Sequence, residues 1–127
     1  MSNPAGLKQW WPLLLVRDLA RSLDFYRDRL GFVIANQAQT DERIYWCRLE
    51  RDGVSLMLQQ AEPEDDPPED RGRGVSLYLV CADVDALHAD FAARGLRLDP
   101  PQDTYYGMRQ LFVPEPDGYA VCFETPI

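Results

Sequence analysis

One pattern occurs twice in this chain, and this repetition constrains the fold more than any other feature. In each copy an apolar run is followed by an aspartate, by apolar residues at helical spacing, and by a glycine. The first copy spans Trp11 to Phe32 and the second spans Ser76 to Arg97. This order predicts a strand, an acidic N-cap, a helix and a glycine stop in each copy.

The correspondence continues downstream, where an Asp-Gly pair opens an alternating run in each copy. From Asp18 to the first pair at Asp52 is 34 residues, and from Asp83 to the second at Asp117 is also 34. Equal spacing favours an internal duplication. The sequence therefore predicts an α+β fold made of two βαβββ modules. We expect one domain over 1–127, with module one at 7–60, an acidic linker at 61–73 and module two at 74–126.

Apolar periodicity also gives the expected extent of each element. In module one we expect strands near 9–16, 33–39, 43–50 and 54–60, with a helix over 19–30. In module two we expect strands near 75–81, 96–98, 108–113 and 119–124, with a helix over 84–94. The proline- and acid-rich linker is expected to be solvated.

Composition narrows the possible partners and location. The 127 residues carry a net charge of −8, which argues against nucleic acid because phosphate binding needs a basic face. The same acidity could favour a cationic ligand. No apolar run is long enough to span a bilayer and no signal peptide is evident, so no membrane association is expected. Three cysteines without metal-site spacing suit reduced thiols, so we expect a cytoplasmic protein.

Strand alternation predicts which residues pack beneath the helices and which point away from them. The set expected in the core is Leu14, Val16, Leu56, Leu58, Leu77, Leu79, Val121 and Phe123. The set expected on the opposite face is Trp11, Leu13, Leu15, Ser55, Met57, Gln59, Ser76, Tyr78, Val80, Ala120, Cys122 and Glu124. The second set is mostly apolar with a few polar groups, which is typical of a small-molecule pocket.

Four segments of the chain read VRDLARSLDFYRDRLGF, DGVSLML, VSLYLVCADVDALHADFAARG and LFVPEPDGYAVCFE. Together they resemble the vicinal oxygen chelate superfamily. That group includes glyoxalase I, extradiol dioxygenases, fosfomycin-resistance enzymes and bleomycin-resistance proteins. The resemblance implies that the sheets curl into a cup-shaped, open mixed barrel, usually in a homodimer. It also implies that metal ligands, where present, lie on the first and fourth strands of each module.

The positions that the resemblance assigns to metal ligands are occupied here by Trp11, Met57, Ser76 and Cys122. Only Cys122 offers a plausible ligand atom for a divalent metal, so we expect no metal and no cofactor. The single histidine, His88, is expected on the second helix rather than in the cup. No catalytic residue is therefore predicted.

The residues predicted to bind a ligand are collected here: Trp11, Leu13, Trp46, Met57, Gln59, Ser76, Tyr78, Tyr105, Tyr106, Arg109, Cys122 and Glu124. Trp11 could stack on a planar or cationic ligand, or it could plug the cavity. Cys122 is expected to be a buried inert thiol rather than a nucleophile.

Three functions remain open at this stage. The first is a metal-free protein that binds a cationic or aromatic small molecule, such as a bleomycin-type or other antibiotic, as a homodimer. The second is a lyase, isomerase or dioxygenase type of enzyme with an atypical metal site or none, using Glu124, Tyr78 or Arg109. The third is an interaction domain whose filled cup binds no ligand.

Overall fold

Two βαβββ modules make up the fold, as the repeat predicts. The structure is a computed structural model that describes residues 4–65 and 71–127. Module one contains β1 (Leu13–Val16), α1 (Leu19–Leu23), the π-helix η1 (Asp24–Arg29), β2 (Val33–Gln39), β3 (Ile44–Arg51) and β4 (Val54–Gln60). After the short 3-10 helix η2 (Pro63–Asp65), module two contains β5 (Ser76–Val80), α2 (Val84–Ala93), β6 (Gln102–Asp103), β7 (Met108–Pro114) and β8 (Ala120–Pro126).

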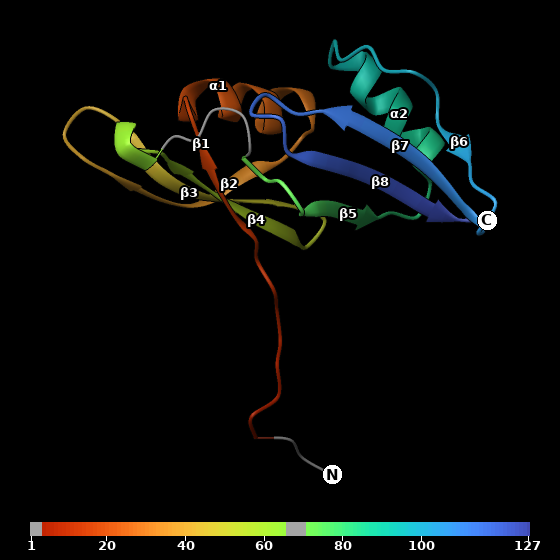
Figure 1. The fold of residues 1–127 in the computed structure, drawn as a ribbon, viewed down its shortest axis with the longest axis horizontal. Helices are drawn as coiled ribbons and strands as arrows, with labels where there is room; N and C mark the ends of the chain where they lie inside the picture. Colours follow the sequence, from red (N-terminus) through yellow and green to blue (C-terminus); the bar gives the residue numbers. More distant parts are fainter. Residues whose placement is uncertain (1–3, 66–70) are drawn as a thin grey trace.

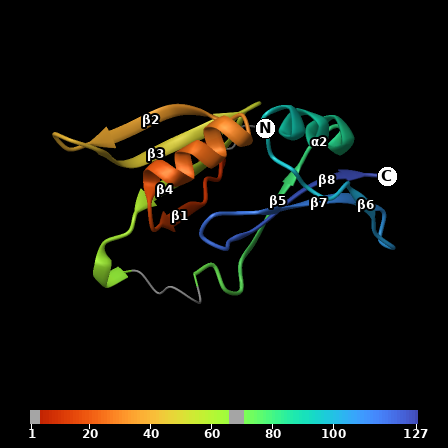
Figure 2. The same cartoon turned by 90° about the horizontal axis from the view of Figure 1, so that it is seen from above.

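Each module forms a four-stranded mixed sheet of the same topology. The strand orders are β1-β4-β3-β2 and β5-β8-β7-β6, with the first pair of each sheet parallel and the others antiparallel. The parallel partner lies 44 residues further on in both modules, at 13 to 57 and at 76 to 120. The sheets lie side by side with both helices on the same side, and Figure 2 shows the two helices as neighbours. The barrel is open rather than closed.

The core is the predicted one. All eight residues expected beneath the helices are buried or partly buried and belong to one apolar cluster. The helix of module one adds Leu19, Leu23, Tyr26 and Leu30, and α2 adds Val84 and Phe91. Asp18 and Asp83 cap the helices as expected, each accepting a hydrogen bond from the backbone three residues on. No helix in the described part of the chain is long and apolar enough to cross a membrane.

Three expected elements differ from the structure. The first strand begins at Leu13, and the preceding residues from Pro4 form an extended arm that leaves the body (Figure 1). The helix expected over 19–30 changes from α to π at Asp24, where the N–H of Leu30 donates to the carbonyl of Phe25, 3.0 Å away. This wider turn keeps both Phe25 and Leu30 in the core.

The third difference is in module two, where residues 96–98 form no strand and β6 follows only at Gln102. The Nε2 atom of His88 lies 3.1 Å from the carbonyl oxygen of Leu98, so Nε2 carries the proton and donates to it. Leu98 is thereby tied to α2 instead of to a neighbouring strand. His88 lies on the second helix, as expected.

The ends of the two helical segments are linked to each other by arginines. The guanidinium of Arg29 donates to the carbonyl of Arg94, and Nη1 of Arg51 donates to the carbonyl of Leu30 at 2.6 Å. Asp90 on α2 accepts from Arg51 and Arg94, each at 3.0 Å. Cations at helix carboxyl ends satisfy free carbonyls and complement the helix dipole. These contacts help to fix the two modules against each other.

A buried carboxylate forms a second junction between the modules. Glu115, only 7% exposed, follows β7. One of its oxygens accepts the N–H groups of Asp117 and Tyr119 at 2.7 and 3.1 Å, and the other accepts the hydroxyl of Tyr26 at 3.3 Å. Burial raises the pKa of Glu115, although the two backbone hydrogen bonds oppose this. The loop between β7 and β8 is thus held against the helix of module one.

The expected solvated linker is only partly described, because residues 66–70 lie outside the described residues. At its carboxyl end the side chain of Arg71 is 5% exposed and lies 3.3 Å from Asp117. The same guanidinium donates to the carbonyl of Leu15 at 2.9 Å. This end of the linker is therefore packed between the modules rather than solvated.

Candidate functional site

Both sheets leave one side uncovered, which we call the open face. Figure 1 shows the helices on the opposite side of both sheets. Cross-strand partners share a face, so the pairing of Trp46 with Gln59 and of Tyr78 with Cys122 places these residues together on it. The predicted division into core and opposite face is correct, because the core set packs beneath the helices. Whether the open face binds a ligand remains a prediction.

In module two the open face carries a polar network centred on Gln110. This side chain is 7% exposed, and its amide nitrogen donates to the hydroxyl of Tyr106 at 2.8 Å and to a carboxylate oxygen of Glu124 at 2.9 Å. Desolvation raises the pKa of nearby Tyr78, and the charges of Cys122 and Glu124 add to the effect. This face therefore presents a neutral phenol near the side chain of Glu124, which the hydrogen bond from Gln110 orients.

Cys122 lies in the same region but is almost fully buried. Its Sγ donates a weak hydrogen bond to the carbonyl of Phe123 at 3.6 Å. Burial raises the pKa of the thiol to about 11, with the charge of Glu124 adding to the effect. Such a thiol is protonated at neutral pH, and no histidine lies within hydrogen-bond distance among the contacts of the described residues. The arrangement favours an inert thiol over a nucleophile.

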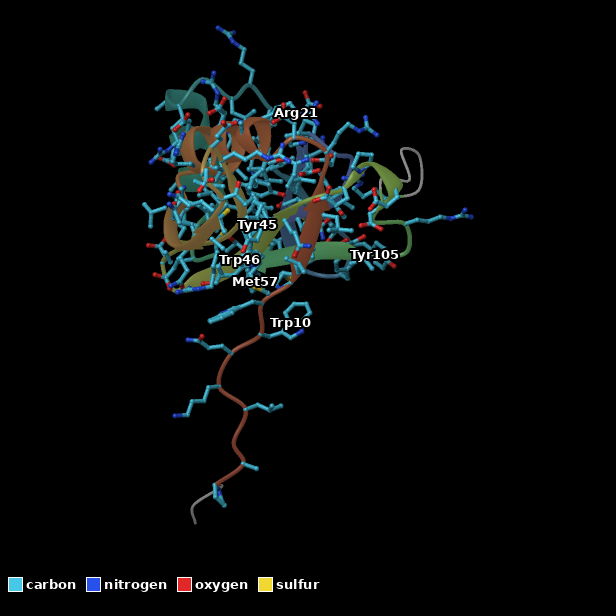
Figure 3. The ribbon with its side chains drawn as sticks, turned by 90° about the vertical axis from the view of Figure 1, so that its left-hand side faces the viewer. Trp10, Arg21, Tyr45, Trp46, Met57 and Tyr105 are labelled. Atoms are coloured by element: carbon cyan, nitrogen blue, oxygen red, sulfur yellow. The ribbon has the colours of Figure 1, made fainter. Side chains whose placement is uncertain are left out.

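A groove of about 390 Å³ opens where the arm leaves the body, and we call it the arm groove. Its walls come from three segments that are distant in sequence: the arm, the start of β4 and the edge strand β5. It brings together Trp11, Ser76 and Tyr78, three of the predicted ligand-binding residues, with Trp10 and Val80. Figure 3 shows Trp10 on the arm just beyond the body, with Met57 and Trp46 at the adjoining part of the body.

A second groove, of about 440 Å³, lies at the far edge of module two. Gln110 and Phe112 of β7 contribute to it together with the segment that runs from Arg97 to Thr104. It shares Gln110 with the polar network. The two grooves flank the open face of module two on opposite sides, since β5 and β6 are the outer strands of that sheet.

Module one places an arginine at the middle of its open face, a residue that the sequence analysis did not select. Arg48 lies opposite Met57 on β4. Its Nε donates to Asn36 at 2.9 Å and its Nη1 donates to Ser55 at 2.8 Å. The centre of the guanidinium lies 4.5 Å from the centroid of the Trp11 ring. Arg48 therefore covers one face of the Trp11 ring, which is an aromatic wall of the arm groove.

Two predicted binding residues lie elsewhere. Arg109 was expected as a charged contact of the pocket, but its Nε donates to Asp85 of α2 at 3.0 Å and its Nη1 donates to Asp103 at 2.9 Å. Strand alternation turns Arg109 toward the helix side, opposite to Gln110, and it lines neither groove. Tyr105 is fully exposed in the loop before β7, where it contacts the ring of Tyr106, and it lines neither groove.

The four positions expected to hold metal ligands do not suit a divalent cation. Trp11 is stacked on Arg48, Met57 offers only a soft thioether, and the thiol of Cys122 is buried and protonated. The hydroxyl of Ser76 alone does not make a site. Within residues 4–65 and 71–127 no cluster of three His, Cys, Asp or Glu side chains could hold a metal.

Residues 9–123 match the family described as the Glyoxalase/Bleomycin resistance protein/Dioxygenase superfamily. The chain belongs to this superfamily. The duplicated βαβββ topology of the chain matches the fold of this superfamily. Among curated proteins, none matches the sequence significantly.

Several solved structures resemble most of the chain. TnmS3, an antibiotic binding protein from Streptomyces sp. CB03234, is 28% identical with a TM-score of 0.70, over 94% of this chain and 98% of that one. A glyoxalase/bleomycin resistance protein from the same organism is 29% identical, with a TM-score of 0.65 over 87% and 94%. The bleomycin resistance determinant encoded on the transposon Tn5 is 19% identical, with a TM-score of 0.69 over 94% and 98%, and shows the shared fold.

Two residues of the open face, Arg48 and Gln110, were missed from the sequence for the same reason. Both lie on middle strands, β3 and β7, whereas the residues expected on the open face by alternation come from the first and last strands of each module. In β3 the buried Cys47 and Leu49 fix the phase, which puts Arg48 on the open face. In β7 the buried Leu111 would have done the same for Gln110. The signal was present in the sequence and needed only to be extended to the middle strands.

Proposed function

We propose that this chain is a metal-free protein that binds planar, antibiotic-type small molecules on its open face and sequesters them without chemistry. The observation that carries the proposal is the convergence of Trp10, Trp11 and Tyr78 on the arm groove. Such a groove, with a few polar groups among apolar walls, is typical of small-molecule sites. The likeness to TnmS3, an antibiotic binding protein, supports the same class of ligand.

The polar groups of the open face suit recognition better than catalysis. Gln110 holds Glu124 and Tyr106 in fixed positions, which gives a ligand defined acceptors and donors. A general acid or base must be placed against a reacting group, and Cys122, buried and protonated, is poorly suited to act as a nucleophile. Binding without turnover therefore accounts for more of this face than an enzymatic site does.

Intrinsic fluorescence tests this function, because all three tryptophans of the chain lie on the arm or on the open face. The protein is titrated with metal-free bleomycin and with 9-anthracenemethanol, a neutral planar probe, at low and high salt. We expect saturable quenching that survives salt for at least one of them, and a loss of affinity of tenfold or more in Trp11→Ala. Tyr45→Phe, at a half-exposed aromatic residue of β3 that does not line the arm groove, is the matched control. If neither compound gives saturable quenching, the proposal is refuted.

The same face also supports association of two copies as a homodimer. Tyr78, Val80 and Phe112 are 51%, 63% and 60% exposed on it, and Leu7 and Trp10 are exposed on the arm. Contiguous apolar surface of this kind usually marks an interface, and pairing about a twofold axis is the commonest arrangement. Light scattering after size-exclusion chromatography should give a dimer that Val80→Glu weakens. A monomer at micromolar concentration would contradict this part of the proposal.

A further inference from the structure

We propose that the stack of Trp11 on Arg48 makes the arm groove prefer planar anions, such as aromatic carboxylates or phenolates, over planar cations. This inference rests on the proposed function, because it concerns the charge of the ligand that the same groove binds. It is opposite to the expectation drawn from the net charge of −8.

The guanidinium of Arg48 is held in place from several sides. Its side chain is only 17% exposed. Asn36 and Ser55 accept its hydrogen bonds from the two neighbouring strands, and the indole of Trp11 covers it at 4.5 Å. A positive charge is thus fixed directly behind the aromatic wall, rather than carried on a mobile surface side chain.

This arrangement uses one face of the indole for a cation and leaves the other for a ligand. Trp11 is 39% exposed and lines the arm groove. A cation on the free face would lie roughly 9 Å from the Arg48 charge and would be repelled by it. An anion at the same place would be attracted. Near a protein surface, where the effective dielectric constant is about 20, such a charge changes the binding constant of either ion by roughly threefold once screening by 0.15 M salt is included, so an anion and a cation should differ by about tenfold. The net charge of the whole protein acts over longer distances and is largely screened at 0.15 M salt, where the Debye length is about 8 Å.

Glu50 is the acid that opposes this effect. Its carboxylate lies 3.6 Å from Nη1 of Arg48, and its side chain is 44% exposed. Since Glu50 is partly solvated, it screens Arg48 only in part. Its removal should therefore strengthen the preference for anions, which provides a variant that acts in the direction opposite to the loss of Arg48.

Three anthracene probes of equal ring size test the inference in 0.15 M salt by fluorescence anisotropy. They are 9-anthracenemethanol, which is neutral, 9-anthracenecarboxylate, and 9-anthracenylmethylammonium. In the wild-type protein we expect the carboxylate to bind about tenfold more tightly than the ammonium, with the neutral probe between them. In Arg48→Met this ratio should fall to near one, and in Glu50→Gln it should rise.

Arg109→Met is the matched control, since it removes an arginine on the helix side and should leave the ratio unchanged. Thermal unfolding checks that each variant is folded. If Arg48→Met does not fold, Glu50→Gln and Arg48→Lys carry the test, because the lysine variant should keep a reduced preference for the carboxylate.

The outcomes separate this inference from the proposed function. If the neutral probe binds but the ammonium binds as tightly as the carboxylate, the inference fails and the proposed function stands. A ratio that is the same in Arg48→Met and in the wild type also overturns it. If none of the three probes binds but metal-free bleomycin gives saturable quenching, the inference fails and the proposed function stands. If bleomycin does not bind either, both fail.

Discussion

Replacement of Glu115 should show how strongly the two modules depend on one buried carboxylate. In Glu115→Ala, the N–H groups of Asp117 and Tyr119 and the hydroxyl of Tyr26 lose their acceptor. Each buried donor left without a partner costs about 1–3 kcal/mol, and water that enters at the loop recovers part of this. We therefore expect Glu115→Ala to lower the free energy of unfolding by about 3 kcal/mol. Glu115→Gln keeps an acceptor oxygen and should change it by about 1 kcal/mol or less.

The pH dependence of these variants follows from the sign of the pKa shift. Burial raises the pKa of Glu115 in the folded state, so the folded protein binds this proton more tightly than the unfolded chain does. The stabilisation from protonation is complete below the unfolded value of about 4.3 and is lost as the pH rises through the folded pKa. Glutamine does not titrate. The stability of Glu115→Gln relative to the wild type should therefore increase from about pH 4 toward neutral pH.

Urea unfolding at fixed protein concentration, followed between pH 4 and 8, measures both effects. Tyr26→Phe is the control, since it removes only the hydroxyl and should cost about 1 kcal/mol. Equal destabilisation by alanine and glutamine would refute the reasoning, because the buried donors would then not be what Glu115 satisfies. A loss below about 1 kcal/mol in the alanine variant would refute it as well.

Three further predictions concern single positions. Gly31→Ala should lower the free energy of unfolding by about 2–3 kcal/mol, because φ is 77° and a Cβ would lie 2.7 Å from Nη1 of Arg51. Gly53→Ala is the control in thermal unfolding. Its φ is 82° but the space around it is open, so it should cost only about 1 kcal/mol. Among the three thiols, partly exposed Cys81 should react first with a disulfide reagent at neutral pH, because burial raises the pKa of Cys47 and of Cys122 to about 11. Fast labelling that persists in Cys81→Ser would contradict this. Arg109→Met should leave probe affinity unchanged but raise the pKa of Asp85 measured by NMR, because the hydrogen bond from Arg109 lowers it; an unshifted Asp85 would show that the pair does not form in solution.

Much of the architecture could be predicted because of the duplication. Each element has a counterpart in the other module, and its own sequence pattern and the pattern of that counterpart both predict it. The capping aspartates, the Asp-Gly turns and the alternating strands all lie where the repeat requires them. That residues 96–98 form no strand could not be predicted from their apolar side chains. The carbonyl of Leu98 accepts a hydrogen bond from His88 instead, and that contact depends on tertiary structure.

The site was predicted less completely than the fold. Alternation placed Tyr78, Cys122 and Glu124 correctly on the open face, because buried neighbours fix the phase of short strands. Arg109 was assigned by its charge alone, and charge does not indicate on which side of a strand a residue lies. The contribution of the arm to a groove depends on where residues 8–12 run in space, for which the sequence contains no local signal.

The π-helix at Asp24–Arg29 also indicates how the two halves of the chain have diverged. From the capping aspartate to the glycine stop there are 13 residues in module one (18 to 31) and 12 in module two (83 to 95). A π-turn accommodates one additional residue without shifting the rest of a helix. The additional residue is balanced downstream, because the glycine stop and the Asp-Gly turn are 21 residues apart in module one (31 to 52) and 22 in module two (95 to 117). The pairing of the parallel strands is thereby kept at the same offset in both modules.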